Sequence, residues 1–146
     1  MSRTNEAETD YLNHLFLNAD WTDIGDAAGL QNSAVAGSFF ISLHTADPGE
    51  AGDQETSEAT YTSYGRVEVV RTAAGWTVTG NTADNSALVT FPAATGGSET
   101  ITHVGIGTVR TGAGHLIWSE PLDVSKVISS GIQPEFGIGE LNIVVD

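Results

Sequence analysis

The feature that most constrains the fold of this chain is a series of short runs in which apolar and polar residues alternate. From Ser38 onward, Val, Ile, Thr and aromatic residues recur at every second position, and Gly, Pro and Asn separate the runs. Residues i and i+2 of a strand lie on the same face of a sheet, so such runs indicate half-buried antiparallel strands. We predict a mainly β fold, an antiparallel β-sandwich or a jelly-roll-like domain, with a small barrel as an alternative. After residue 38 no helix-length periodic segment interrupts the runs, which argues against a parallel α/β sheet.

The alternation also locates the expected strands along the chain. In the first of them Phe39, Ile41 and Leu43 share one face, and Phe40, Ser42 and His44 share the other. The runs predict strands over residues 38–45, 65–72, 75–80, 86–91, 99–108, 115–120, 123–129 and 140–146. We therefore expect a β domain spanning residues 38–146.

Residues 1–37 are expected to form an arm with a short helix. Thr4 is a candidate N-cap, and the acids that follow it suit the positive end of a helix dipole. An apolar stripe through the helix and isolated anchors in the irregular chain beyond it must pack on something, because so short a helix is marginal alone. That surface is either the chain's own sheet or a neighbouring subunit, and the sequence leaves both open. The candidate assembly contacts here are Tyr11, Leu15, Phe16, Trp21 and Ile24.

The charge of the chain narrows its possible partners. Against 19 Asp and Glu there are 5 Lys and Arg, a formal net charge of −14. Phosphate backbones and anionic lipid headgroups repel such a surface, so we expect neither a nucleic-acid nor a membrane partner. Eleven of the acids and one base fall within residues 1–60. A negative field concentrated there would steer docking onto a positively charged partner surface.

Few features of the sequence suggest catalysis or a cofactor. Cysteine is absent, which removes disulfides and thiolate chemistry. No serine lies in a nucleophile-elbow pattern, and no histidine pair has the spacing of a zinc-binding helix. His44 and His103 lie on predicted strands and could converge, but ordinary strand histidines are the favoured interpretation. We predict that the chain is not an enzyme and needs no cofactor or metal.

Two acidic loops deserve comparison with calcium sites. Asp20, Asp23 and Asp26 recur every three residues, and residues 47–53 supply several oxygens. Calcium requires six to eight converging oxygens, and neither loop has EF-hand spacing. Solvated acidic loops are the favoured interpretation. Within the second loop, proline and glycine after Asp47 predict a turn. Asp47 and Glu50 would then accept hydrogen bonds or contact a partner.

The second loop also carries a family resemblance. The segment Ser42-Leu43-His44-Thr45-Ala46-Asp47-Pro48-Gly49-Glu50-Ala51-Gly52 resembles the hallmark of small tailed-phage virion structural proteins. Further blocks, among them Tyr64-Gly65-Arg66-Val67 and Thr102-His103-Val104-Gly105-Ile106, occur in the order typical of that family. Its members are labelled either tail-fibre-like or head decoration proteins. The resemblance implies an all-β virion structural protein and brings no catalytic residues with it.

A compact chain without internal repeats cannot be a long fibre by itself. We therefore expect a capsid decoration, or cement, protein that binds between subunits of the major capsid protein on the capsid exterior. It would be made in the cytoplasm of the bacterial host, since no signal peptide precedes it, and would associate as a homotrimer. The alternative is a structural protein of the tail fibre, tail tip or baseplate that binds a tail protein and takes part in host attachment.

Overall fold

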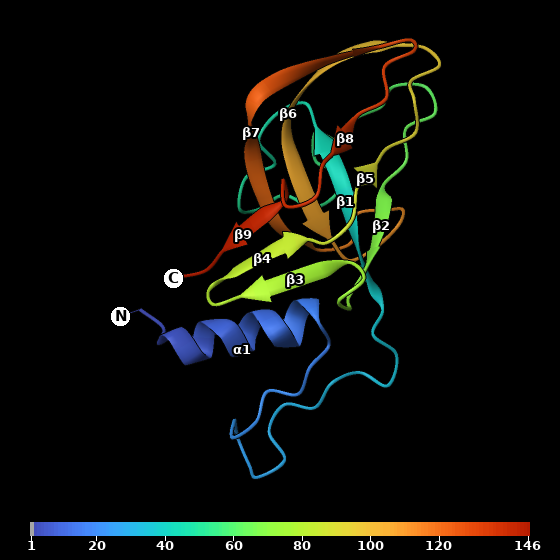
Figure 1. Ribbon diagram of the computed structural model, residues 1–146. Coiled ribbons are helices and arrows are strands. Elements are labelled where there is room, and N and C mark those ends of the chain that lie inside the picture. The colour runs from blue at the N-terminus through green and yellow to red at the C-terminus, as the bar shows by residue number, and fades with distance from the viewer. Residues whose placement is uncertain (1) are drawn as a thin grey trace. The chain divides into compact units, whose positions relative to one another are not determined.

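The computed structural model describes residues 2–146 and shows a mainly β chain with antiparallel sheets and one short helix near the N-terminus (Figure 1). This confirms the fold class expected from the alternation. The chain forms two compact units. The elements are α1 (Asn5–Phe16), β1 (Ser38–His44), β2 (Val67–Val70), β3 (Trp76–Thr79), β4 (Thr82–Asn85), β5 (Val89–Thr90), β6 (Ser98–Gly107), β7 (Leu116–Ser129), β8 (Glu135–Phe136) and β9 (Asn142–Val144).

The first unit takes its residues from three stretches of the chain: those up to Ser38, Val70–Val89 and Phe136–Asp146. Its sheet has the order β3-β4-β9, and both pairings are antiparallel. Figure 1 shows α1 lying along this small sheet. The sequence prediction of an arm over residues 1–37 and a β domain over 38–146 stays a prediction.

Helix α1 packs within its own chain through one buried stripe. Thr4 caps the helix, as expected, by accepting a hydrogen bond from the N–H of Ala7 at 3.4 Å. Leu12 and Phe16 are fully buried. The Phe16 ring meets the buried Trp76 ring of β3 edge to face, with 4.6 Å between their centroids. Of the two surfaces that the sequence left open for this stripe, the structure shows the chain's own sheet.

The chain after α1 forms an ordered loop closed by paired contacts. Trp21 and Leu30 exchange two backbone hydrogen bonds of 2.9 Å. The Asn18 side chain bonds both the N–H and the carbonyl of Ser33, at 2.9 and 2.8 Å. Asp20 accepts from the N–H of Asn32 at 2.7 Å. We call residues 18–33 the N-terminal finger; one isolated bridge and side-chain hydrogen bonds hold its two sides together, which local sequence patterns did not predict.

The second unit comprises Phe39–Val69 and Thr90–Glu135. Its sheet has the order β2-β1-β6-β7, with β6 antiparallel to both β1 and β7. One face carries the predicted apolar set of β1 into the core, where Phe39, Ile41 and Ile106 are buried. The other face of β1 is buried as well, because Ser42 and His44 are fully covered.

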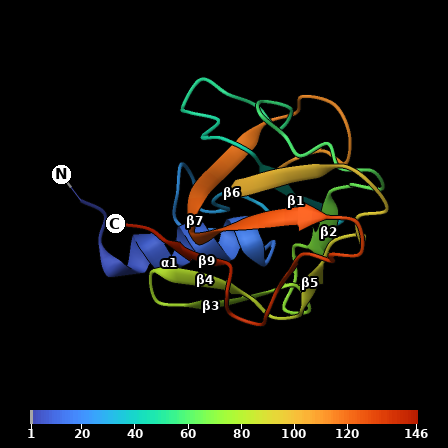
Figure 2. The same ribbon diagram turned by 90° about the horizontal axis from the view of Figure 1, so that it is seen from above.

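Strand β7 is a single irregular strand where the sequence predicted two. Ile101 lies opposite Lys126 and His103 opposite Pro121, so residues 122–125 face one residue of β6. A second shift leaves Ile117 as an extra residue, since Ile106 pairs with Trp118 and Gly107 with Leu116. Figure 2 shows the sharp bend between the two lengths of β7. Residues 121 and 122, which the sequence prediction placed between two strands, belong to a large bulge of a single strand.

One further strand prediction was wrong, and strand β4 was missed. The expected strand over residues 86–91 is reduced to β5, which pairs with the equally short β8. Strand β4 was not predicted, because its two buried positions hold the small Ala83 and the polar Asn85. Asn85 compensates for its burial by donating to the carbonyls of Ala87 and Gly137 and accepting from Leu141 N–H.

Candidate functional site

The loop that follows β1 begins with a turn built from side-chain and glycine geometry. Asp47 Oδ1 accepts a hydrogen bond from the N–H of Gly49 at 2.8 Å, and Gly49 has a φ of +69°. Pro48 is buried at the base of the turn. A Cβ atom on Gly52 would lie 2.2 Å from the Pro48 carbonyl oxygen, so only glycine fits there. The turn predicted from Asp, Pro and Gly is confirmed.

A second turn, centred on Asp53, continues the loop. Asp53 Oδ1 accepts hydrogen bonds from Glu55 N–H, Thr56 N–H and Thr56 Oγ1 at 2.9, 3.0 and 3.0 Å. The Thr56 hydroxyl, followed by the backbone donors, lowers the pKa of Asp53. The carboxylate therefore fixes this turn as an internal acceptor.

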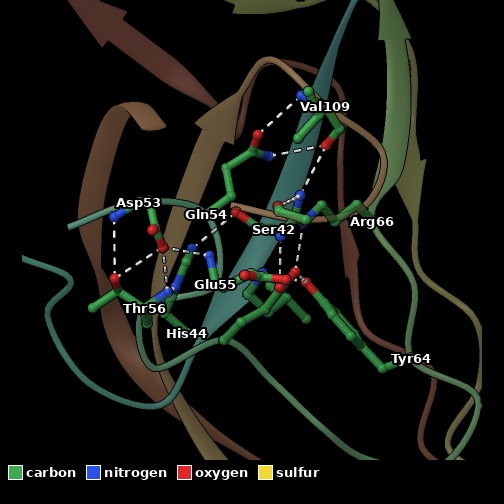
Figure 3. Close-up of polar contacts among 12 residues, drawn as sticks. Ser42, His44, Asp53, Gln54, Glu55, Thr56, Tyr64, Arg66 and Val109 are labelled. Carbon is green, nitrogen blue, oxygen red and sulfur yellow. Dashed lines mark hydrogen bonds and ion pairs between the residues drawn. The ribbon is translucent and has the colours of Figure 1, made fainter. Parts of the chain in front are cut away.

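A serine and a histidine lie together beneath the loop. Ser42 Oγ and His44 Nε2 are 2.8 Å apart, and His44 Nδ1 lies 2.8 Å from the carbonyl oxygen of Thr56 (Figure 3). The carbonyl can only accept, so Nδ1 carries the proton and Nε2 accepts from the serine. Burial lowers the pKa of His44, which favours the neutral ring. Both side chains are 0% exposed, so no substrate reaches this pair.

The glutamine next to Asp53 joins the loop to the segment after β6. Gln54 is fully buried and exchanges two side-chain hydrogen bonds with the backbone of Val109, at 2.9 and 3.2 Å (Figure 3). Its own N–H donates to the Ala113 carbonyl at 2.9 Å. The space it needs comes from Gly107, where a Cβ would lie 2.0 Å from Gln54 Cδ.

An ion pair closes the end of the loop. Arg66 Nε lies 2.7 Å from Glu58 Oε1, and Arg66 also donates to the carbonyls of Val109 and Gly112. Burial opposes the charge of Arg66, but the hydrogen bond and attraction of Glu58 outweigh it and raise the pKa of Arg66. Tyr64 donates to the same carboxylate at 2.8 Å, and burial raises its pKa. These contacts, drawn in Figure 3, hold residues 45–58 over one face of the sheet.

The loop so fixed leaves two of the predicted contact residues at the surface. Asp47 and Glu50 are exposed. They line an open depression of about 510 Å³ together with the start of β7. The other residues around it are Gly49, Gly52, Leu116, Ile117, Trp118 and Ser119. This depression, which we call the loop–β7 depression, is the candidate functional site of the second unit.

The five predicted contacts of the arm all belong to the first unit. Phe16 is buried in that unit, and Leu15 is half-buried and accepts from Arg71 through its carbonyl. The rings of Tyr11 and Trp21 meet edge to face with 6.3 Å between centroids. Ile24, 38% exposed, lies near the tip of the N-terminal finger. Surface for a partner therefore remains on Tyr11, Leu15, Trp21 and Ile24.

The two strand histidines do come together, since His44 and His103 are paired across β1 and β6. Both ring nitrogens of His44 make hydrogen bonds within the chain, to Ser42 and Thr56. His103 Nδ1 lies 2.9 Å from Thr102 Oγ1. Within residues 2–146 no group of three or more His, Cys, Asp or Glu is placed to hold a metal ion. In the same residues no helix is long and apolar enough to cross a membrane.

Sequence reasoning missed the residues that fix the loop. The Gln54 side chain bonds Val109, 55 residues away, and Arg66 bonds Val109 and Gly112, 43 and 46 residues away. No local spacing reveals these contacts. A signal did exist for Arg66: it belongs to the resemblance block Tyr64-Gly65-Arg66-Val67. The resemblance thus marked structural residues without showing what they do.

Comparison with known proteins yields one family. The family model described as "Podophage GP4 fiber I protein gp80" matches residues 2–144, almost the whole chain. No curated protein matches the chain.

Proposed function

The chain belongs to the family described as podophage GP4 fiber I protein gp80, and from this membership we propose that it is a fibre-type component of the tail. A phage virion structural protein was expected from the sequence, and the family supports that role. Our first expectation, a cement protein on the capsid exterior, fits the family description less well than the tail-fibre alternative did. The family match is the observation that carries the proposal.

The fold suggests how a short chain contributes to a fibre. Among residues 2–146, neither unit contains a repeated or coiled-coil element that would give length on its own. The chain therefore acts as a compact module whose reach comes from association with other copies or with a tail protein. A homotrimer, as expected from the sequence, is the arrangement we propose for the copies.

We assign attachment to the rest of the tail to two exposed acidic features, the N-terminal finger and the loop–β7 depression. The N-terminal finger carries Asp20, Asp23 and Asp26 beside the exposed Ile24. The loop–β7 depression carries Asp47 and Glu50. Both suit a positively charged surface of a tail protein. We propose no nucleic-acid or membrane partner, because the net charge of −14 repels both.

The proposed role is structural and not catalytic. The Ser42–His44 pair has the distance of a nucleophile–base pair but lies entirely beneath the loop. Gly105 is packed against it: a Cβ there would lie 2.6 Å from both Ser42 Oγ and His44 Nε2. A substrate would have to displace the loop and its ion pair to reach the serine.

Copy number on the virion tests the proposal. Quantitative mass spectrometry of purified particles should find the chain in a fixed ratio to tail proteins. The ratio to the major capsid protein should be small. Amounts comparable to the major capsid protein would overturn the tail assignment and restore the cement interpretation.

A further inference from the structure

The loop–β7 depression lies beside the edge of a sheet. The second unit's sheet has the order β2-β1-β6-β7, so among the described residues β7 has a strand partner on one side only. Edge strands present backbone groups that an additional strand can bind. Asp47 and Glu50 line the depression opposite residues 116–119 of this strand.

The hydrogen bonds of β1 identify which residue of β7 points outward. Leu43 donates its N–H to Tyr64 Oη at 3.0 Å, and its carbonyl accepts from Ala59 at 2.8 Å. Both contacts lie away from β6. In an antiparallel sheet the bonding direction alternates from one residue to the next and from one strand to its neighbour. Val104, opposite Leu43, therefore directs its N–H and carbonyl toward β7.

The same alternation fixes the bonding direction of residues in the edge strand β7. Val104 lies opposite Glu120, so Glu120 bonds inward and its neighbour Ser119 bonds outward. Ser119 thus presents one N–H and one carbonyl at the rim of the depression that it helps to line. One residue of an added antiparallel strand can form hydrogen bonds with both the N–H and the carbonyl of Ser119.

Irregularities of β7 limit how long an added strand can be. Ile117 is an extra residue on the N-terminal side of this site, and residues 122–125 bulge on the other. Pro121 lacks an N–H group. Such features protect an edge from extended pairing. The usable stretch is therefore a few residues around Ser119.

Charge then selects the kind of segment that fits. Both carboxylates of the depression are exposed, and no ion pair recorded in residues 2–146 uses either of them. In an extended segment, side chains two residues apart point to the same side. Ser119 lies in register with Gly105 and Ser42, on the face that the loop covers. A Lys or Arg paired with Ser119 would share that face and reach toward Asp47 and Glu50, where a charge-assisted hydrogen bond is strong.

A second copy of this chain is poorly equipped to supply such a segment. Arg66 and Arg110 are paired with glutamates, and Arg71 donates to the carbonyls of His14 and Leu15 at the end of α1 and to that of Ala36. Lys126 is part of β7 itself, and Arg3 lies over the Tyr11 ring. The basic residue must therefore come from another protein.

We propose that the loop–β7 depression is a docking site for a short, extended, basic segment of another virion protein, bound by the outer backbone groups of Ser119 and by the carboxylates of Asp47 and Glu50. That the segment belongs to a virion protein rests on the proposed function. The binding chemistry does not depend on it.

The test is an NMR titration of the purified full-length chain with a blocked peptide of sequence Thr-Arg-Thr-Arg-Thr. We expect saturable shifts of the Ser119 amide and its neighbours in the depression. A Thr-Glu-Thr-Glu-Thr peptide should cause none. Equal shifts with both peptides, or shifts confined to other parts of the chain, would overturn the proposal.

Two variants and a control separate the backbone and charge contributions. Ser119→Pro removes the outward N–H, and proline is tolerated where an edge N–H faces solvent; binding should be lost. Asp47→Asn combined with Glu50→Gln should weaken binding about tenfold, while Glu135→Gln, which changes an exposed acid outside the depression, should not. If Ser119→Pro does not fold, the charge variant still decides, and unchanged binding in it would overturn the proposal.

A further outcome concerns self-association. If the Ser119 amide shifts as protein concentration rises without peptide, a second copy occupies the edge and the proposal is wrong. None of these measurements uses virions. A tail location established by copy number would therefore stand even if the peptide failed to bind, and the reverse also holds.

Discussion

His44 makes the stability of the second unit depend on pH. Burial lowers its folded-state pKa below the ordinary value of 6.5, so the unfolded chain takes up this proton at a higher pH than the folded chain. The free energy of unfolding should be constant above about pH 6.5 and fall as the pH drops toward the folded pKa. Denaturant titrations between pH 8 and 5 measure this slope. His44→Gln should flatten it, and an unchanged slope would contradict the assignment.

Gly107 of β6 tests how closely the loop packs against the sheet through Gln54. Gly107→Ala places a methyl group against Gln54 and should cost about 2 kcal/mol or more of unfolding free energy. Gly65 is the matched control, because a Cβ there meets nothing within 4 Å. Gly65→Ala should change stability by no more than about 0.5 kcal/mol. Equal effects in thermal or chemical unfolding would show that the close approach of Gln54 is not essential.

The ion pair between Arg66 and Glu58 should reveal the cost of an unpaired buried charge. The Arg66 side chain is 3% exposed and that of Glu58 16%. Arg66→Met leaves the Glu58 carboxylate without its charged partner and should lower the unfolding free energy by about 3 kcal/mol. Adding Glu58→Leu should recover part of that loss. A double variant that is less stable than Arg66→Met would contradict this explanation.

At the scale of elements, α1 and the N-terminal finger depend on one arginine. Arg71 donates to the carbonyls of His14 and Ala36 at 2.8 and 3.0 Å, and to that of Leu15. It therefore ties the end of α1 to Ala36, in the chain just after the N-terminal finger. Arg71→Ala should speed hydrogen exchange and proteolysis within residues 17–37 while the second unit keeps its protection. Arg110→Ala, at an exposed ion pair, is the control and should leave the finger unchanged.

The elements also show what sequence reasoning can reach. Alternation located β1 and β6, and helical spacing located the buried stripe of α1, because in each the apolar residues follow the period of the element. It missed β4, where the buried Asn85 is satisfied by residues from Ala87 to Leu141. It divided β7 at Pro121, because a bulge and a turn have the same local sequence. Asp47 and Glu50 were recognised as surface acids, but their β7 neighbours are more than 60 residues away and only the fold brings them together.

At the scale of the whole molecule, we expect the net charge of −14 to govern association. If both acidic features dock on a basic tail surface, attachment should weaken as salt screens the attraction, with a Debye length of about 10 Å at 0.1 M and 3 Å at 1 M. Adding purified chain to particles that lack it, at increasing NaCl, measures this dependence. Attachment that is independent of salt would point to an apolar interface instead.

Oligomeric state is a separate property of the molecule. A homotrimer should have three times the 15.2 kDa mass of the chain. Light scattering coupled to size exclusion measures this mass directly. A monomer in solution would show that copies associate only on the particle, or not at all.

The central claim is that this chain is a fibre-type component of the phage tail. Immunogold electron microscopy of intact virions, with antibodies raised against the N-terminal finger and the folded chain, tests it most directly. We predict gold particles at the tail, with the capsid surface unlabelled. Labelling distributed over the capsid would contradict the claim and would show that the protein decorates the head.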